Sequence, residues 1–207
     1  MFTFIHMKTI QHKTAKMLVK SRGIVTTRDF MVKGIHPETV HRMVMQGKLQ
    51  KVDRGQYMIP QDTSQRYVSF AQIAKKNPDA VICLLSALAY HRIGTQNPHK
   101  VWIALPRGTR TPNMEHLSLE VVTYSHDKWK TGVEVHRLIN VDVQITNIPK
   151  TVVDCFKHRN KIGIDVAVEA LRDVIENGRC KINEFTPYAK IARVRRVMRP
   201  YIEALIE

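Results

Sequence analysis

The chain has 207 residues, with 33 lysines and arginines against 18 aspartates and glutamates, a formal net charge of +15 and a pI near 10.0. This excess favours a polyanionic partner, either nucleic acid or an acidic membrane surface. No apolar run reaches the roughly 18 residues that a membrane helix needs, and the N-terminus lacks the apolar centre and cleavage site of a signal peptide. We therefore expect a cytoplasmic protein without membrane contact.

The three cysteines, Cys83, Cys155 and Cys180, are widely spaced and form no CxxC motif or cluster with histidines. This pattern predicts neither a disulfide framework nor a zinc site. We expect reduced, buried thiols without a chemical role.

The first predicted helix runs from about Thr9 to Ser21, because its apolar residues recur on one face and its lysines on the other. Gly23 ends it. The residues before Met7 fit no later pattern, so Met7 offers an alternative start to Met1.

Two short helices joined by a tight turn are predicted next. A hydroxyl of Thr26 or Thr27 can cap the first helix, and Asp29 lies in its positive first turn. Gly34 suits the left-handed conformation that closes such a helix. Pro37 is favoured at the first position of the second helix.

The second of these helices has two faces. Val40, Met43 and Val44 follow the i, i+3, i+4 spacing and are expected to face inward. The opposite face is expected to carry Thr39, Arg42 and Gln46, with His36 and His41 nearby. Arginine reads guanine, glutamine reads adenine, and threonine contacts a thymine methyl or a phosphate. An ordinary solvated face is the alternative for this helix taken alone.

A basic hairpin follows, with alternating strands at 49–52 and 56–59 around the turn Asp53-Arg54-Gly55. A basic wing straddles the phosphate backbone while the recognition helix enters the major groove. The order of elements predicts a winged helix-turn-helix that binds double-stranded DNA, in preference to one that contacts only protein. The predicted DNA-binding residues are Thr27, Arg28, His36, Thr39, Arg42, Gln46, Lys48, Lys51 and Arg54.

The predicted fold class is α+β, with the winged helix at residues 8–60, a linker at 61–66 and a mixed domain at 67–207. The linker is polar and opens with Pro60. In the second domain, helices are expected at 67–76 and 80–93. A sheet of roughly four strands is expected from the segments 101–105, 117–124, 133–138 and 141–146.

Helices are expected to cover this sheet, at 149–156, at 164–176, at 182–189 with a break at Pro187, and at 191–206. The helix 164–176 has an apolar face and an acidic face. The acidic face could meet a basic partner, fold back on the same protein or be solvated. The arginines of the last segment, Arg193, Arg195, Arg196 and Arg199, could bind phosphate or be ordinary surface charge.

An enzymatic function is not expected. A nuclease of the restriction type needs a carboxylate followed by Glu-x-Lys, but Glu115, Glu120 and Glu134 are followed two residues later by Leu, Val and His. GxSxG, glycine-rich phosphate loops and HExxH are also missing from the sequence. We expect no cofactor and no metal. A repressor whose second domain senses a small molecule is the alternative function, although no convergent polar set predicts a pocket.

Taken together, the two halves resemble the AbiEi antitoxins of type IV toxin–antitoxin (abortive infection) systems over roughly Lys8 to Leu205. The motifs that carry the resemblance are 23–27, 34–35, the recognition helix, 52–57, Ile148-Pro149-Lys150-Thr151-Val152-Val153-Asp154-Cys155-Phe156, 159–163 and 165–167. The resemblance implies a winged helix that binds inverted repeats in its own promoter and represses the operon. It also implies a C-terminal domain that counteracts a nucleotidyltransferase-like toxin encoded alongside, without a stable complex between the two proteins.

Overall fold

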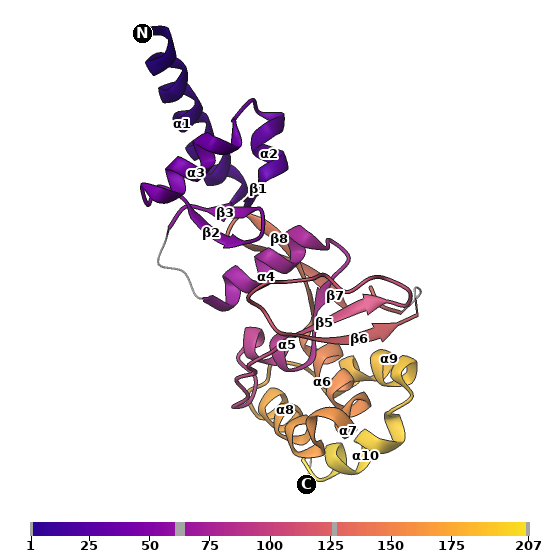
Figure 1. Cartoon of the computed structure of the whole chain (residues 1–207). Helices are drawn as coiled ribbons and strands as arrows, with labels where there is room; N and C mark the ends of the chain where they lie inside the picture. Colours follow the sequence, from indigo (N-terminus) through magenta and orange to yellow (C-terminus); the bar gives the residue numbers. More distant parts are fainter. Residues whose placement is uncertain (1, 61–64, 126–127, 206–207) are drawn as a thin grey trace. The chain divides into compact units, whose positions relative to one another are not determined.

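Two compact units make up the chain in the computed structural model, which describes residues 2–60, 65–125 and 128–205 (Figure 1). The N-terminal unit contains Met1–Pro78, Pro112–Leu117 and Arg137–Val143. The C-terminal unit contains Asp79–Thr111, Ser118–His136 and Gln144–Glu207. Each unit packs around a hydrophobic core of its own.

The N-terminal unit has the element order that the sequence predicts, which is helix, turn, helix and hairpin. Its elements are α1 (Phe2–Arg22), β1 (Val25–Thr26), α2 (Thr27–Val32), α3 (Pro37–Met45), β2 (Gln50–Asp53) and β3 (Gln56–Met58). β1, which the sequence does not reveal, joins the hairpin in a three-stranded antiparallel sheet of order β1-β3-β2. α1 begins at Phe2, so it is longer than the predicted helix.

The core of this unit lies between its three first helices. Phe30, Ile35 and Met43 are fully buried, and Leu18 and Val40 pack with them. The apolar stripe predicted for α3 therefore faces this core, and so do Ala15, Leu18 and Val19 of the stripe predicted for α1, whereas Ile10 of that stripe is exposed.

The helix α4 (Gln65–Lys76) also belongs to the N-terminal unit, because the division between the units falls after Pro78. The Gln72 side chain donates its Nε2 hydrogen to the backbone oxygen of Val52 at 2.5 Å, which ties α4 to the hairpin. Of the predicted linker, residues 61–66, the first four lie outside the described residues and the last two begin α4.

Gly23 ends α1 at a point where no side chain fits. Its φ of +70° favours glycine, and an added Cβ would lie 1.4 Å from the carbonyl oxygen of Ile139 in the same unit. Beside it, Asn140 donates its side-chain N–H to the backbone oxygen of Lys20 at 2.8 Å. The end of α1 is therefore held against the turn at residues 139 and 140.

A five-stranded sheet of order β6-β5-β4-β8-β7 lies mainly in the C-terminal unit, except that the end of β7 and the start of β8, within residues 137–143, belong to the N-terminal unit. The strands are β4 (Val81–Ile82), β5 (Val101–Pro106), β6 (Leu119–Tyr124), β7 (Val133–Leu138) and β8 (Val141–Thr146). The prediction of about four strands missed β4, which is the central strand and pairs with β5 and β8. Residues 80–93 form one apolar run, because a strand buried on both faces has no alternation to separate it from the helix that follows.

Helices complete the C-terminal unit, as the sequence predicts. They are α5 (Leu84–His91), α6 (Ile148–Lys157), α7 (Arg159–Ile162), α8 (Ile164–Glu176), α9 (Ile182–Ala192) and α10 (Arg195–Glu203). The predicted break at Pro187 is wrong, because α9 continues through it, with Phe185 and Ala189 buried on either side. The last helix begins later than predicted, since Arg193 adopts a left-handed φ of 60° and closes α9.

Candidate nucleic-acid interface

The helix-turn-helix begins with a capping box. The Thr26 hydroxyl accepts the backbone N–H of Asp29 at 3.1 Å, and the Asp29 carboxylate accepts the backbone N–H of Thr26 at 2.9 Å. Burial raises the pKa of Asp29, but these Thr26 hydrogen bonds, with the charges of Lys75 and Arg22, hold it below its usual value. The start of α2 is therefore fixed by an ionised carboxylate, as the sequence predicts.

The turn between α2 and α3 also follows the prediction. Gly34 has a φ of +70°, and the backbone N–H of Ile35 donates to the oxygen of Phe30 at 2.9 Å. His36 then caps α3, because its Nδ1 accepts the backbone N–H of Glu38 at 3.3 Å. Only the remaining part of the His36 ring is free for DNA.

The outward face of α3 differs from the prediction at one residue. Thr39 is buried, and its hydroxyl donates to the Gln11 side chain of α1 at 2.8 Å, so its predicted exposure is wrong. α1 covers this part of α3. The sequence of α3 alone does not show this contact. Arg42 is half-buried, and Gln46 is exposed at the end of the helix.

The wing is short and is anchored at its tip. The backbone N–H of Thr27 donates to the carbonyl oxygen of Gly55 at 2.9 Å, which places the turn against the first residue of α2. Arg54 and Arg28 are both exposed there, and Lys51 is exposed on β2. The wing tip and the start of α2 thus form one basic surface, made of Thr27, Arg28 and Arg54, which we call the α2 group.

Asp53 does not reduce the positive charge of this wing. Its side chain is buried and pairs with Lys76 of α4 at 2.9 Å. Burial raises the pKa of Asp53, but hydrogen bonds from Lys76 and from the backbone N–H groups of Arg54 and Glu115 hold it below its usual value. The only carboxylate of the turn is therefore neutralised inside the unit.

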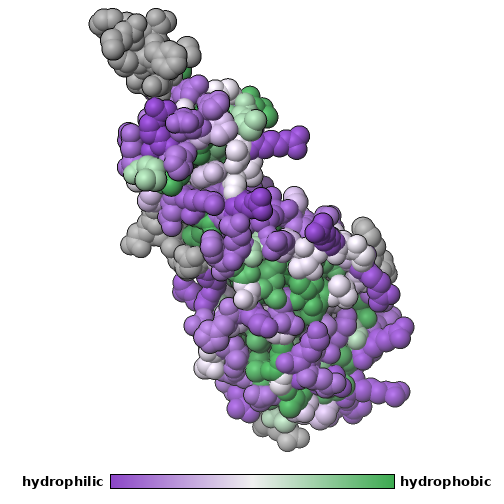
Figure 2. Space-filling model, in the orientation of Figure 1, coloured by the Kyte–Doolittle hydropathy of each residue, from purple (hydrophilic) through white to green (hydrophobic). Residues whose placement is uncertain are grey.

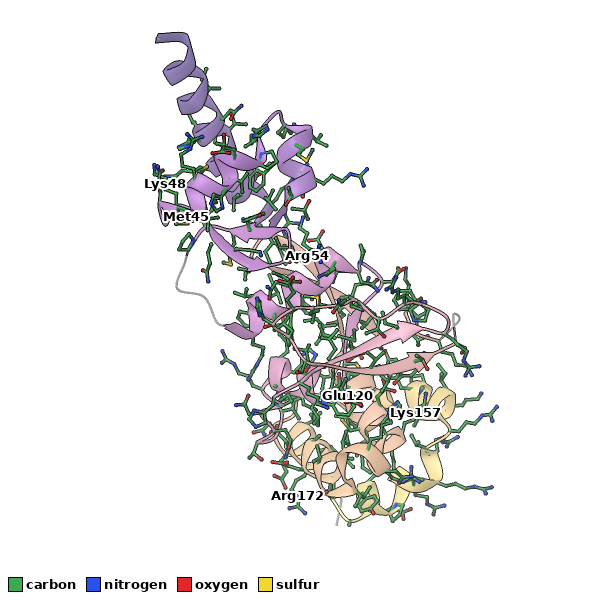
Figure 3. All side chains as sticks on the ribbon, in the orientation of Figure 1. Met45, Lys48, Arg54, Glu120, Lys157 and Arg172 are labelled. Carbon is green, nitrogen blue, oxygen red and sulfur yellow. The ribbon has the colours of Figure 1, made fainter. Side chains whose placement is uncertain are left out.

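A second basic surface lies at the end of α3, made of Arg42, Gln46 and Lys48, which we call the α3 group. The Lys48 ammonium donates to the Gln46 side-chain oxygen at 2.7 Å. Figure 3 shows Lys48 and Arg54 at opposite ends of the hairpin. The structure therefore divides the predicted residues into two groups that a DNA backbone could contact separately.

His12 and Lys16 of α1 join the α3 group, although the sequence did not single them out as DNA-binding. Burial, together with the positive charges of Lys48, Arg42 and Lys16, lowers the pKa of His12 below its usual value. The group thus combines His12 and Lys16 of α1 with Arg42 of α3 and Lys48 of the turn that follows α3. Their signal in the sequence is the lysine face of α1, whose neighbour could not be deduced.

The comparisons with known proteins agree with this geometry. Residues 14–60 match the family described as "Transcriptional regulator, AbiEi antitoxin", which is the segment from α1 to the end of the hairpin. Over this segment the chain is similar to the AbiEi antitoxin family. The AbiEi region is thus that of a DNA-binding transcriptional regulator, and the predicted resemblance is confirmed over these residues.

Comparison of whole chains gives less information. No curated protein matches the sequence. Among solved structures, the chain is similar to the RV2827C protein from Mycobacterium tuberculosis, with a TM-score of 0.57 and 16% identity over 81% of this chain. This chain spans 66% of the length of that one. At such an identity the likeness shows a common fold only.

Outside the AbiEi region, the block at residues 148–156 forms the buried helix α6. Lys150 and Asp154 are both buried and form an ion pair across one turn of this helix. The Lys150 and Lys157 ammonium groups lie 4.7 and 4.1 Å from the centre of the Tyr124 ring. The cavity beside them measures about 10 Å³, which is room for roughly one water molecule. The buried ion pair thus lies in a closely packed part of the unit.

The pKa shifts of the groups around this ion pair, Cys155, Tyr124 and His158, agree with a structural role for the cluster. Burial raises the pKa of both Cys155 and Tyr124, and Asp154 adds to each shift. Burial lowers the pKa of His158 to about 4, and its ring nitrogen lies 3.2 Å from the Tyr124 hydroxyl. At neutral pH the thiol and the phenol stay protonated and His158 stays uncharged.

The acidic face of α8 folds back on its own unit. Glu169 accepts the backbone N–H of Thr95 at 2.9 Å, and Asp173 accepts that of Gly94 at 2.8 Å. Both carboxylates thereby bind the loop that follows α5. Of the three alternatives for this face, the structure thus favours an internal contact over a partner.

The described part of the chain has no helix of the length and apolar character required to cross a bilayer. Most of the visible surface is hydrophilic, with apolar patches on the C-terminal unit (Figure 2).

Proposed function

We propose that this protein is the antitoxin and autorepressor of a type IV toxin–antitoxin system. It binds inverted repeats in the promoter of its own operon and counteracts a nucleotidyltransferase-like toxin encoded beside it. The observation that carries the proposal is that the AbiEi match at residues 14–60 coincides with the two basic groups of the winged helix.

In this function the end of α3 reads the major groove, because Arg42 and Gln46 have the donors and acceptors that distinguish guanine and adenine. Arg54 and Arg28 bind the phosphate backbone next to the wing. Lys48 and Lys51 add phosphate contacts along the hairpin. When these cations neutralise phosphates, counterions are released from the DNA, and the affinity therefore depends strongly on salt concentration.

Two copies of the chain on one operator account for the inverted repeats. Two half-sites on one face of the duplex lie about 10 base pairs apart, or a multiple of that spacing. Each copy then presents its own α3 to one half-site. The site of action is the promoter DNA in the cytoplasm.

Antitoxin activity is proposed for the C-terminal unit, on the basis of the resemblance at residues 148–167. In this proposal the closely packed α6 cluster holds the unit together and takes no direct part in the antitoxin activity. Toxin and antitoxin need not form a stable complex for this activity.

The proposal is tested by two measurements in one strain that expresses the full-length chain. A reporter under the chain's own promoter measures repression, and growth during expression of the adjacent gene measures antitoxin activity. The variant Arg42→Ala/Arg54→Ala should lose repression and keep growth rescue. Lys33→Ala, an exposed lysine in the turn, is the matched control and should keep both. If the wild-type chain does not rescue growth, the antitoxin role is refuted. If the double variant represses the reporter as strongly as the wild-type chain does, the proposed DNA-binding surface is refuted.

A further inference from the structure

The helices α9 and α10 form an open groove on the C-terminal unit that the proposed DNA contacts do not use. The groove has a volume of about 480 Å³. α9 lines it with Ile182, Phe185, Thr186 and Ala189, which follow the i, i+3, i+4, i+7 spacing of a single helix face. α10 lines the other wall with Met198 and Ile202, one turn apart.

The rim of the groove has the opposite chemistry to its floor. Phe185, Ala189 and Met198 are buried and make an apolar floor. Arg195, Arg196 and Arg199 are exposed along the α10 side. Figure 3 shows nitrogen-tipped side chains projecting from this part of the unit.

The positive charge of the rim is mostly uncompensated. Glu203 is the one carboxylate among the lining residues, and it pairs with Arg199 at 2.6 Å. Within the described part of the chain, Arg195 and Arg196 have no ion-pair partner. The groove therefore offers an apolar trough beside two free guanidinium groups.

We propose that this groove binds an amphipathic, acidic helix of another protein. Apolar side chains at i, i+3, i+4 and i+7 of the partner fill the trough, as in other helix-in-groove complexes. Its glutamates or aspartates reach Arg195 and Arg196 at the rim, where bidentate carboxylate contacts are favourable. α9 has 11 residues, so a partner helix of about three turns matches its length.

A second copy of this chain is a poor occupant. Among the described helices, only α8 carries more than one acidic residue. Glu169 and Asp173 of that helix bind backbone N–H groups of their own unit, and Glu176 lies 3.9 Å from Arg172. Among the described residues of α8 this leaves only Asp165 exposed without such a contact, and a single carboxylate does not make an acidic helix face, which points to a different protein.

Nucleic acid and small molecules fit the groove less well. Phosphates would bind the arginines but leave the apolar floor empty, and Phe185 is buried and cannot stack on a base. A small-molecule site needs polar groups that converge within the pocket. Here the arginines and Thr186 are all exposed at the edges.

A designed peptide tests the proposal by fluorescence anisotropy with the full-length protein. The probe is a labelled helical peptide of about 12 residues with leucines at i, i+3, i+4 and i+7 and glutamates elsewhere. Its control is a peptide of the same composition in scrambled order. We expect the amphipathic peptide to bind at least about tenfold more tightly than the scrambled one.

Three variants locate the binding site. Arg195→Glu/Arg196→Glu should weaken peptide binding by about tenfold or more, because attraction becomes repulsion. Thr186→Glu, on the opposite wall, should also weaken it. Arg107→Glu/Arg110→Glu makes the same charge change in the exposed loop after β5 and should alter binding by less than about twofold.

Each contrary result overturns the proposal. Equal binding of the scrambled peptide would show charge attraction without a groove. Loss of duplex-DNA affinity with unchanged peptide binding in Arg195→Glu/Arg196→Glu would assign the rim to nucleic acid. A change in self-association by sedimentation in the same variant would assign the groove to a second copy. None of these readouts depends on repression or toxin rescue.

Discussion

The two units place their charged residues in opposite ways. In the N-terminal unit, Asp29 pairs with Arg22 and Asp53 pairs with Lys76. The arginines and lysines of the two basic groups remain at the surface of this unit. The C-terminal unit buries the Lys150–Asp154 pair inside its most distinctive sequence block. The distinctive sequence block at residues 148–156 thus contributes to the packing of its unit, whereas the proposed DNA-binding surface consists of ordinary exposed basic residues.

The largest effect of a substitution is expected at the buried Lys150–Asp154 pair. Lys150→Met leaves Asp154 as an unpaired buried charge and should lower the free energy of unfolding by about 3–5 kcal/mol. Urea unfolding measures this loss. The double variant Lys150→Met/Asp154→Leu should recover much of the stability, because no charge stays buried. A single-variant loss below about 1 kcal/mol would mean that the pair is solvated.

A smaller effect is expected on DNA binding. Arg42→Ala should lower operator affinity by about 1–3 kcal/mol and relax sequence preference, because it removes a base contact. Arg54→Ala should weaken all sequences alike, because it removes a phosphate contact. Gel-shift titrations with operator and unrelated duplexes separate the two effects. Both variants should unfold at the wild-type urea concentration, and Lys33→Ala should bind as the wild type does.

The effect that is smallest near neutral pH concerns His158 and the acid stability of the C-terminal unit. Because the pKa of His158 falls from 6.5 to about 4 on folding, the unfolded chain takes up a proton first as the pH decreases. His158 thus lowers stability progressively between about pH 6.5 and pH 4. Urea unfolding across this range should show a shallower decline for His158→Gln than for the wild type. Parallel curves would place His158 in a solvated position.

Local signals in the sequence were sufficient to predict several elements. The limits predicted for α8, residues 164–176, agree with the structure, because Gly163 and Asn177 bound a strongly amphipathic run. Gly34 and Pro37 likewise defined the turn before α3. In these cases the physical cause lies within a few residues of its effect.

Other features depended on tertiary contacts and could not be predicted. Thr39 has the spacing of an outward residue on α3, yet α1 covers it through Gln11. The sequence places Asp53 in an exposed turn, yet its side chain is buried in an ion pair with Lys76 of α4. His12 joins the α3 group for the same reason, since only the packing of α1 on α3 brings it near Arg42.

Binding of DNA by the exposed cations of the winged helix should make operator affinity depend on salt concentration. The logarithm of affinity should fall linearly with the logarithm of salt concentration, by about 0.9 for each phosphate contacted. Arg54→Ala should reduce this slope by about one unit, and Lys33→Ala should leave it unchanged. If the operator affinity of the wild-type chain does not change with salt concentration, the winged helix does not bind DNA through these cations and instead contacts protein.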